Sequence, residues 1–250
     1  MSTVRKAKSK MKKICLLILF CFMATLPVFE QETQADSRTM YANEVRIMQE
    51  KLEKARQELK REIKIEVKVE NGGTITGNVK CKRMKFPENI VVFIEEVGSN
   101  DYSAPEEHGV IGQFDRTFVP HVIAVQKGTI INFPNSDIVK HNVFSPQDGC
   151  NQFNLGTYEI GVVKQVTFDK SCYVPIQCNV HAEMSAFVAV FDNPYFTVTL
   201  KDGNFEIDNI PPGNYTLKTW HERFESVTQE VRVETGKITD VSFVLKKKRK

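Results

Sequence analysis

The stretch CYVPIQCNVHAEMSAFVAVF, Cys172–Phe191, decides the fold. Its first seven residues alternate, so that Val174 and Ile176 share one face with the two flanking cysteines, which is the pattern of a β-strand with one buried face. Residues 185–191 form a second β run that is apolar on both faces. Only residues 179–184 separate the two runs, and the stretch therefore predicts two neighbouring strands joined by a short loop.

The short loop carries metal-binding side chains at regular spacing. Cys178, His181 and Met184 are each three residues apart, and His141 lies 37 residues before Cys178. A thiolate, two imidazoles and a thioether are the ligands of a copper site in which three ligands form a plane and methionine is a weak axial ligand. In such a site neither the cuprous nor the cupric ion has its preferred geometry, so the ligands move little when the ion gains or loses an electron. The set predicts one copper ion.

The residues around these four ligands resemble a known family. Phe118–Asp137, His141–Val143 and Cys178–Met184 look like the cupredoxins, and the spacing in the last segment is closest to amicyanin. The resemblance covers residues 113–192 and all four ligand positions. It implies a Greek-key β-sandwich with a type 1 (blue) copper ion, held by His141, Cys178 and His181 in the plane and by Met184 on the axis.

Two neighbours of the ligands matter as well, Asn142 through the same resemblance and Glu183 as a departure from it. The resemblance implies that Asn142 ties the two ligand loops together. Glu183 adds a carboxylate beside Met184, where it would favour the oxidised ion or offer a hard ligand to zinc. Amicyanin has prolines beside its second histidine, whereas this chain has Val180 and Ala182.

A second small β-sandwich is expected from the turns of the C-terminal segment. Residues 198–220 alternate polar and apolar side chains around an Asp-Gly turn and a Pro-Pro-Gly corner. They resemble the carboxypeptidase regulatory-like, transthyretin-type domain, whose opening strand resembles residues 73–80. We therefore expect the cupredoxin domain, 105–192, to be inserted in a sandwich made of residues 72–97 and 193–246. In the alternative layout residues 88–96 begin the cupredoxin domain.

The N-terminal residues have the pattern of an export signal. Residues 1–13 carry six positive charges and no negative one, and residues 14–29 are mostly apolar. We expect a signal peptide over 1–35, with the mature chain beginning near Asp36 in the periplasm or another exported compartment. Membrane association follows only in the alternative in which this segment is retained as an anchor.

A helix is expected between the signal peptide and the first strands. Apolar residues recur over 41–59 with spacings of three and four, which predicts a helix within 36–63 with a heptad stripe. The stripe is consistent with a homo-oligomeric coiled coil or with a helix that packs on its own domain. The expected fold class is thus mainly β, with two sandwiches and an N-terminal α-helix.

Composition excludes several classes of protein. With 41% hydrophobic and 26% charged residues the chain is globular, and five histidines are too few for a multicopper oxidase. Between residues 36 and 245 there are 23 basic and 29 acidic side chains. That balance of −6 does not fit a nucleic-acid-binding protein. The basic tail at 247–250 is interpreted as a solvated end, or alternatively as a contact for anionic lipid or an acidic partner.

The remaining cysteines and histidines are interpreted as structural. Cys150 and Cys172 could form a disulfide, as could Cys81 with either of them, and free buried thiols are equally consistent with the sequence. His121 and His221 lie outside the ligand motif. His121 is expected to be a hydrogen-bonded structural residue, and His221 is expected to be hydrogen-bonded at a surface.

The sequence therefore favours an exported protein that is not an enzyme. It would carry single electrons between redox partners such as a dehydrogenase, a cytochrome or another oxidoreductase. Two other interpretations stay open, a periplasmic copper carrier or sensor and an accessory subunit of a redox complex.

Overall fold

The structure is a computed structural model that describes residues 46–47, 50, 59–82, 84–98, 102–146 and 150–249. The chain divides into two units, residues 1–58 and 59–250. In the first unit the three described residues are helical, and Arg46 forms an ion pair with Glu50 one turn later, at 2.8 Å. The expected signal peptide at 1–35 and most of the helix expected over 36–63 lie outside the described residues.

The second unit consists of strands joined by turns and loops, with no helix among its described residues. Residues 59–63, expected at the end of the N-terminal helix, are not helical and contain the first strand. No described helix has the length and apolar character needed to cross a bilayer. The strands are β1 Glu62–Ile63, β2 Gly73–Cys81, β3 Val91–Ile94, β4 Gly109–Val110, β5 Gly112–Phe114, β6 Thr117–Val119, β7 Val122–Gln126, β8 Thr129–Pro134, β9 His141–Ser145, β10 Phe153–Tyr158, β11 Val163–Phe168, β12 Tyr173–Gln177, β13 Ser185–Phe191, β14 Phe196–Val198, β15 Asn204–Ile210, β16 Gly213–Trp220, β17 Thr228–Val233 and β18 Ile238–Leu245.

The first sandwich contains the four expected copper ligands. Its larger sheet has the order β1-β7-β13-β12-β9-β10, and its smaller sheet has the order β11-β8-β4, with the β5-β6 hairpin beside it. The inward side chains alternate along each strand and form one core that includes Phe133, Phe168 and Val188. Strand β1 pairs in parallel with β7, so this sandwich also uses residues that precede the range expected from the sequence.

The second sandwich is made from both ends of the 59–250 unit. Its sheets have the orders β14-β3-β16-β17 and β15-β2-β18, and they enclose a separate core that includes Ile75, Leu217 and Phe243. Strands β2 and β3 pair only with strands of this sandwich. Strand β3 thus belongs to the second sandwich, whereas β1 of the first sandwich precedes β2, so the first sandwich is not formed by one inserted segment alone.

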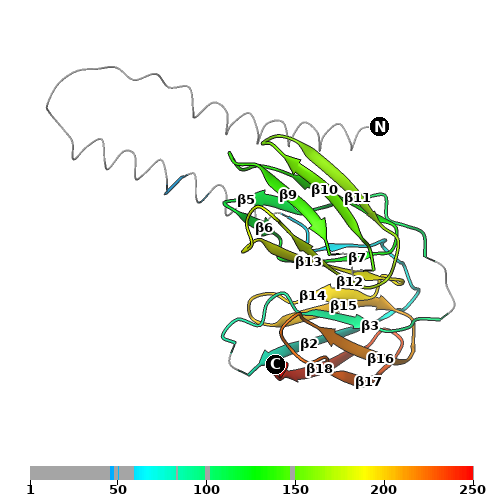
Figure 1. Cartoon of the computed structure of the whole chain (residues 1–250). Helices are drawn as coiled ribbons and strands as arrows, with labels where there is room; N and C mark the ends of the chain where they lie inside the picture. Colours follow the sequence, from blue (N-terminus) through cyan, green and yellow to red (C-terminus); the bar gives the residue numbers. More distant parts are fainter. Residues whose placement is uncertain are drawn as a thin grey trace, which may run out of the picture. The chain divides into compact units, whose positions relative to one another are not determined.

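The two sandwiches are stacked, as Figure 1 shows, and share a third apolar cluster. Strands β3, β7 and β13 are buried on both faces, because alternate side chains point into different clusters. Val91 and Phe93 of β3, for example, join Ala189 and Phe191 of β13 in the shared cluster. A strand buried on both faces has to be apolar throughout, as the runs VVFI and VIAVQ nearly are.

Candidate metal centre

Strands β9 and β12 bring the expected ligands to one end of the first sandwich. His141 is the first residue of β9, and Cys178 directly follows the last residue of β12. The two strands are antiparallel, with Gln177 opposite Phe144, so the start of β9 lies near the end of β12. His181 and Met184 lie in the connection from β12 to β13.

Three of the expected ligands form a compact cluster. The ligand atoms of His141, Cys178 and His181 all lie within 4.8 Å of one another. The Nδ1 atoms of the two imidazoles face each other at 3.1 Å, and their ring planes are inclined by 61°. His141 and Cys178 are buried, whereas His181 is partly exposed.

Met184 is placed by the same short loop. Its backbone N–H donates to the carbonyl oxygen of His181 at 3.1 Å, which closes a turn between the two residues. The Met184 side chain is buried and belongs to the same apolar core as Cys178. The thioether is thus kept away from solvent beside the strand that carries the thiol.

The second ring nitrogen of His141 is occupied by a carboxylate that the sequence analysis did not identify. His141 Nε2 lies 2.7 Å from Asp137 Oδ2. An ionised carboxylate can only accept, so Nε2 carries the proton and Nδ1 presents its lone pair toward His181. Asp137 lies only four residues before His141. That short separation was the one signal in the sequence that could have indicated the contact.

Backbone amides hold the Asp137 carboxylate in place. The N–H groups of Asp115 and Arg116 donate to its two oxygens, at 2.5 and 2.9 Å. Both residues have positive φ, 48° and 54°, in the turn between β5 and β6. Two successive residues of this conformation form the tight turn that suits a two-residue hairpin, and here it directs both amides toward one carboxylate.

Asn135 organises the loop that precedes His141. Its buried side-chain amide donates to the carbonyl oxygens of Val139 and Tyr158, at 2.9 and 3.1 Å, and its Oδ1 accepts from the N–H of Asp137. Tyr158 pairs with His141 across β9 and β10, and burial raises the pKa of its phenol well above the usual value. The loop is therefore fixed from inside by neutral groups.

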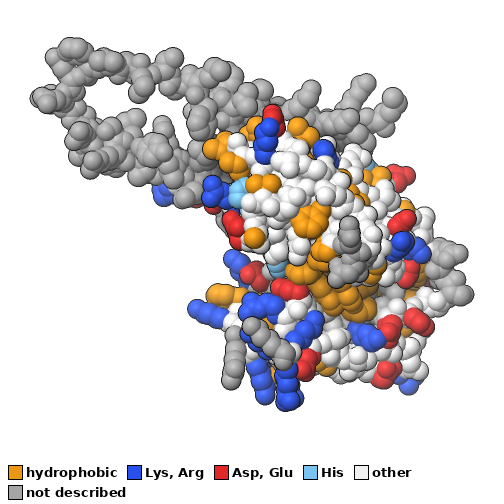
Figure 2. Space-filling view, in the orientation of Figure 1, with side chains coloured by type: hydrophobic (Ala, Val, Ile, Leu, Met, Phe, Trp, Pro, Cys, Tyr) orange, Lys and Arg blue, Asp and Glu red, His pale blue; other side chains and the backbone are white. Residues whose placement is uncertain are grey.

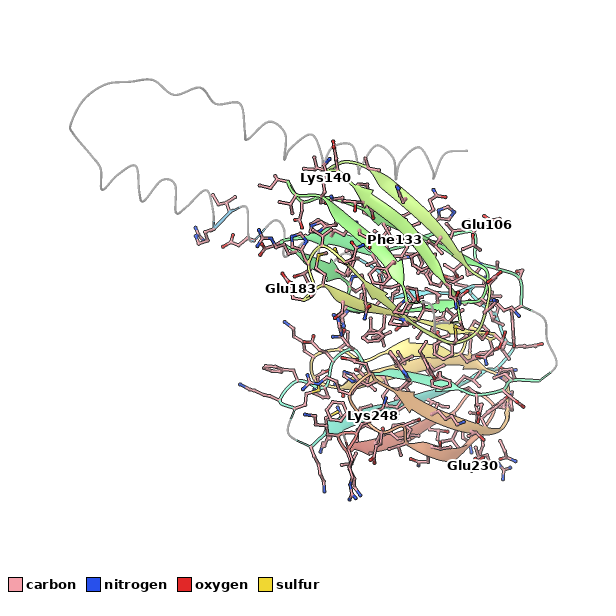
Figure 3. All side chains as sticks on the ribbon, in the orientation of Figure 1. Glu106, Phe133, Lys140, Glu183, Glu230 and Lys248 are labelled. Carbon is pink, nitrogen blue, oxygen red and sulfur yellow. A yellow bond between two sulfur atoms is a disulfide. The ribbon has the colours of Figure 1, made fainter. Side chains whose placement is uncertain are left out.

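Two expected roles near the ligands are not reproduced. Asn142 was expected to tie the ligand loops together, but its amide donates to Asn154 of β10 at 2.9 Å, and its Oδ1 is buried without a partner. The same Asn154 Oδ1 also accepts from the backbone N–H of Gly156, at 2.9 Å. Glu183 is exposed at the outer edge of the first sandwich, as Figure 3 shows, and is not part of the ligand cluster.

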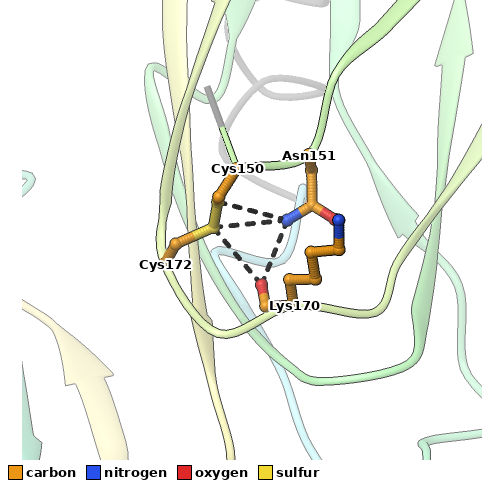
Figure 4. Close-up of a disulfide and its surroundings, with 4 residues drawn as sticks. All are labelled: Cys150, Asn151, Lys170 and Cys172. Carbon is orange, nitrogen blue, oxygen red and sulfur yellow. Dashed lines mark hydrogen bonds between the residues drawn. A yellow bond between two sulfur atoms is a disulfide. The ribbon is translucent and has the colours of Figure 1, made fainter. Parts of the chain in front are cut away.

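A disulfide joins Cys150 to Cys172, which was one of the pairings left open by the sequence. Cys172 precedes β12 and Cys178 follows it, so the disulfide lies at the opposite end of this strand from the candidate ligands. The Asn151 amide donates to the Lys170 carbonyl oxygen at 3.0 Å beside the two sulfurs (Figure 4). Cys81 is not bonded to either, and burial raises the pKa of its thiol to about 11.

His121 and His221 are hydrogen-bonded outside the cluster, as expected, but His221 is buried rather than at a surface. His121 Nδ1 lies 3.1 Å from the Ser185 carbonyl oxygen, and its Nε2 lies 3.2 Å from Oε1 of Glu222 in the second sandwich. His221 is buried and its Nδ1 accepts from the N–H of Arg223.

Comparisons with known proteins find both resemblances again. Residues 184–246 match the family model of the carboxypeptidase regulatory-like domain. That match begins at Met184, one residue before β13, and so includes a strand that pairs within the first sandwich. A comparison with curated proteins found no match.

Solved structures that resemble part of the chain include an amicyanin, a purple cupredoxin and a copper-containing nitrite reductase. A reduced tryptophan-to-tyrosine mutant of amicyanin is 17% identical, with a TM-score of 0.33, over 35% of this chain and 86% of that one. A purple cupredoxin from Nitrosopumilus maritimus is 20% identical, with a TM-score of 0.30, over 33% and 98%. A copper-containing nitrite reductase from Thermus scotoductus SA-01 is 20% identical, with a TM-score of 0.33, over 39% of this chain and only a quarter of its own length.

The donor set of the cluster suits a copper ion. Two neutral imidazoles with facing Nδ1 atoms and one buried thiol offer two borderline ligands and one soft ligand, a combination that copper accepts in both oxidation states. Because Asp137 occupies Nε2 of His141, the free lone pair of that ring already points into the cluster. The residues therefore fit the group that the sequence predicts.

Proposed function

We propose that the chain is an exported type 1 copper protein that carries single electrons between redox partners. The observation that supports this most strongly is the buried convergence of Cys178 with the Nδ1 atoms of His141 and His181. Together with Met184 these residues supply four protein donors for one copper ion. Copper bound there would supply one-electron chemistry between its cuprous and cupric forms.

The chain's own residues would keep the ligand geometry constant. Asp137 fixes the tautomer and the ring orientation of His141, and the β5-β6 turn fixes Asp137. The backbone hydrogen bond from Met184 to His181 restrains the second ligand loop. Rigid ligands lower the reorganisation that accompanies electron transfer, which suits a carrier. A catalytic site would instead keep a position open for substrate.

Electrons would enter and leave most directly through His181. It is partly exposed, whereas the other three proposed ligands are buried. Val180 beside it and Ile138 beside Asp137 are exposed apolar side chains, with 49% and 77% of their surface accessible. We propose that a redox partner docks on this end of the first sandwich.

The disulfide and the N-terminal sequence pattern both favour an exported protein. The Cys150–Cys172 disulfide is of the kind that forms and persists in oxidising compartments. It agrees with the basic and apolar pattern over residues 1–35, and we propose the periplasm or another exported compartment. Homo-oligomerisation through 41–59 and retention of the signal segment in a membrane remain proposals from the sequence.

The visible spectrum of purified protein with added cupric ion tests the proposed site. We expect an intense blue absorption from the bond between copper and the Cys178 sulfur, and its loss in Cys178→Ser. Cys81→Ser is the matched control, because Cys81 is the other described free thiol and lies in the second sandwich. A colourless protein that takes up zinc instead would contradict the proposal.

Partial exposure of His181 favours one rival function, a copper carrier or sensor that exchanges its ion. Rapid, reversible reduction and reoxidation of the bound ion without its loss would support the electron carrier. Ready transfer of cuprous ion to a competing chelator, at a rate set by access to His181, would support the rival.

A further inference from the structure

Three segments that are distant in the sequence meet at one end of the second sandwich. Strands β2 and β18 are parallel, so their final residues lie side by side, and Lys82 donates its backbone N–H to the Leu245 carbonyl oxygen at 3.1 Å. The C-terminal residues then pair with the loop after β16, where the N–H of Lys248 donates to the Arg223 carbonyl oxygen at 3.0 Å. The backbone of the described part of the C-terminal tail is therefore attached to the sandwich, while the side chains of Lys247–Arg249 are exposed to solvent.

These segments gather positive charge on one surface, here called the basic end. It consists of the exposed residues Lys80, Lys82, Lys85 and Arg223 with Lys246–Arg249. Glu88, Glu222 and Glu225 are the acidic residues of the same segments, and Glu222 is already paired with His121. Figure 2 shows blue side chains gathered at the lower left of the second sandwich, and Figure 3 places Lys248 and Glu230 at opposite ends of it.

Apolar side chains are exposed among these charges. Phe86 has 51% of its surface accessible and Val244 has 54%. The Lys85 ammonium lies 5.1 Å from the centre of the Phe86 ring, so the aromatic ring and the charge occupy the same patch. Val244 is level with Lys80 across the β2-β18 pair.

We propose that the basic end binds the surface of an anionic lipid bilayer. Lysine and arginine side chains near such a surface are attracted to its negative headgroups, and neighbouring aromatic and aliphatic side chains reach the boundary of the acyl chains. The basic end offers both kinds of side chain, the lysine and arginine residues and the exposed Phe86 and Val244. The body of the chain, with its excess of acidic residues, would be repelled, so the charge distribution also orients the protein on the bilayer.

The mixed character of the basic end favours lipid over other polyanions. A nucleic-acid surface would require the acidic body to lie beside phosphates, and an acidic protein patch would leave Phe86 and Val244 without an apolar partner. A bilayer offers headgroup phosphates and an apolar layer within one contact. The basic end contains none of the proposed copper ligands, so this proposal stands or falls independently of the proposed function.

Vesicle binding by the full chain tests the proposal. Neutral phosphatidylcholine vesicles are compared with vesicles that contain phosphatidylglycerol. We expect Lys82→Gln, Lys85→Gln, Lys246→Gln and Lys247→Gln, combined in one variant, to weaken binding to the anionic vesicles about tenfold or more. The matched control combines Lys60→Gln, Lys127→Gln, Lys170→Gln and Lys237→Gln, which removes the same charge from exposed positions elsewhere and should bind like the wild type.

A local readout separates the basic end from the N-terminal segment, which carries positive and apolar residues of its own. In Phe86→Trp, we expect the added tryptophan emission to shift to shorter wavelength with anionic vesicles and to return in high salt. Equal binding by the two lysine variants, or an unchanged Phe86→Trp spectrum, would overturn the proposal. So would tighter binding to double-stranded DNA than to the anionic vesicles at the same ionic strength.

Discussion

His141 uses both of its ring nitrogens, and the two face different partners. Nε2 donates to Asp137, and Nδ1 faces the second imidazole. A carboxylate in this position fixes the tautomer and makes the imidazole a better ligand. The sequence indicates His141, Cys178 and His181 together because their residue types suit one metal ion, and the fold brings their ligand atoms within 4.8 Å of one another. Asp137 could not be predicted from the sequence, since its role depends on a turn more than 20 residues away.

Asp137→Asn should therefore weaken the proposed copper site without unfolding the protein. The amide lacks the negative charge, and its N–H₂ group would face the backbone N–H of Asp115 or Arg116. We expect copper affinity, measured by competition with a chelator, to fall by about 10–100-fold. The copper–thiolate absorption should also shift, because the His141 ring loses its restraint.

Asp115→Asn is the matched control for this prediction. It removes the same charge from the exposed turn that contacts Asp137, keeps the backbone N–H that donates to Asp137, and leaves the bond to His141 intact. Equal losses of affinity in both variants would mean that Asp137 acts only through long-range charge. An unchanged spectrum in Asp137→Asn would contradict a positioning role.

The strands with long apolar or alternating runs are the elements that the sequence predicts best. Strands β12 and β13 were expected from the stretch that carries the ligands, and their pairing places the loop between them. Strand β1 was not expected, because two residues are too short to show a period, and it exists only through pairing with β7. Residues 59–63 were expected at the end of a helix and are not helical. Pairing of β1 with β7, a contact that the sequence does not show, determines their conformation instead.

At the scale of elements, the Cys150–Cys172 disulfide should stabilise the first sandwich without affecting the ligands. It closes a loop of 22 residues and joins the segment after β9 to the start of β12. Loss of such a cross-link costs about 3 kcal/mol in the chain-entropy account. We expect Cys150→Ser combined with Cys172→Ser to lower the free energy of unfolding by about that amount in a denaturant titration.

The copper spectrum distinguishes a local from a global effect of that double variant. The disulfide lies at the other end of β12 from Cys178, so the blue absorption of the folded variant should match that of the wild type. Loss of the absorption under conditions where the variant remains folded would show that the two ends of the strand are coupled.

Over the whole molecule, the inserted arrangement brings residues from both sandwiches together. Glu222 follows β16 of the second sandwich and pairs with His121, which precedes β7 of the first. His121 also contacts the Ser185 carbonyl oxygen, one residue after Met184. The sequence indicated the insertion through two separated segments that resemble one domain. It could not show which side chains meet across the boundary, because that depends on how the shared apolar cluster packs.

His121 and His221, which lie at this boundary, should contribute to the free energy of unfolding with opposite dependences on pH. The hydrogen bond to Glu222 raises the pKa of His121, so its stabilisation is complete below the unfolded pKa of about 6.5 and is lost as pH rises through the folded value. Burial lowers the pKa of His221 to about 4. Between about pH 6.5 and 4 the unfolded chain therefore binds a proton that the folded chain does not, so the free energy of unfolding decreases as the pH is lowered.

Denaturant titrations of metal-free protein across pH can separate the two effects. The free-energy difference between wild type and His221→Gln should fall on the order of 3 kcal/mol from pH 6.5 to pH 4, following about 1.4 kcal/mol per pKa unit. For His121→Gln the difference should instead fall as pH rises above 6.5. Each difference compares proteins that share all other side chains, so contributions common to both cancel. Differences that do not vary with pH would mean that neither histidine changes its protonation on folding, and the boundary would then depend on apolar packing alone.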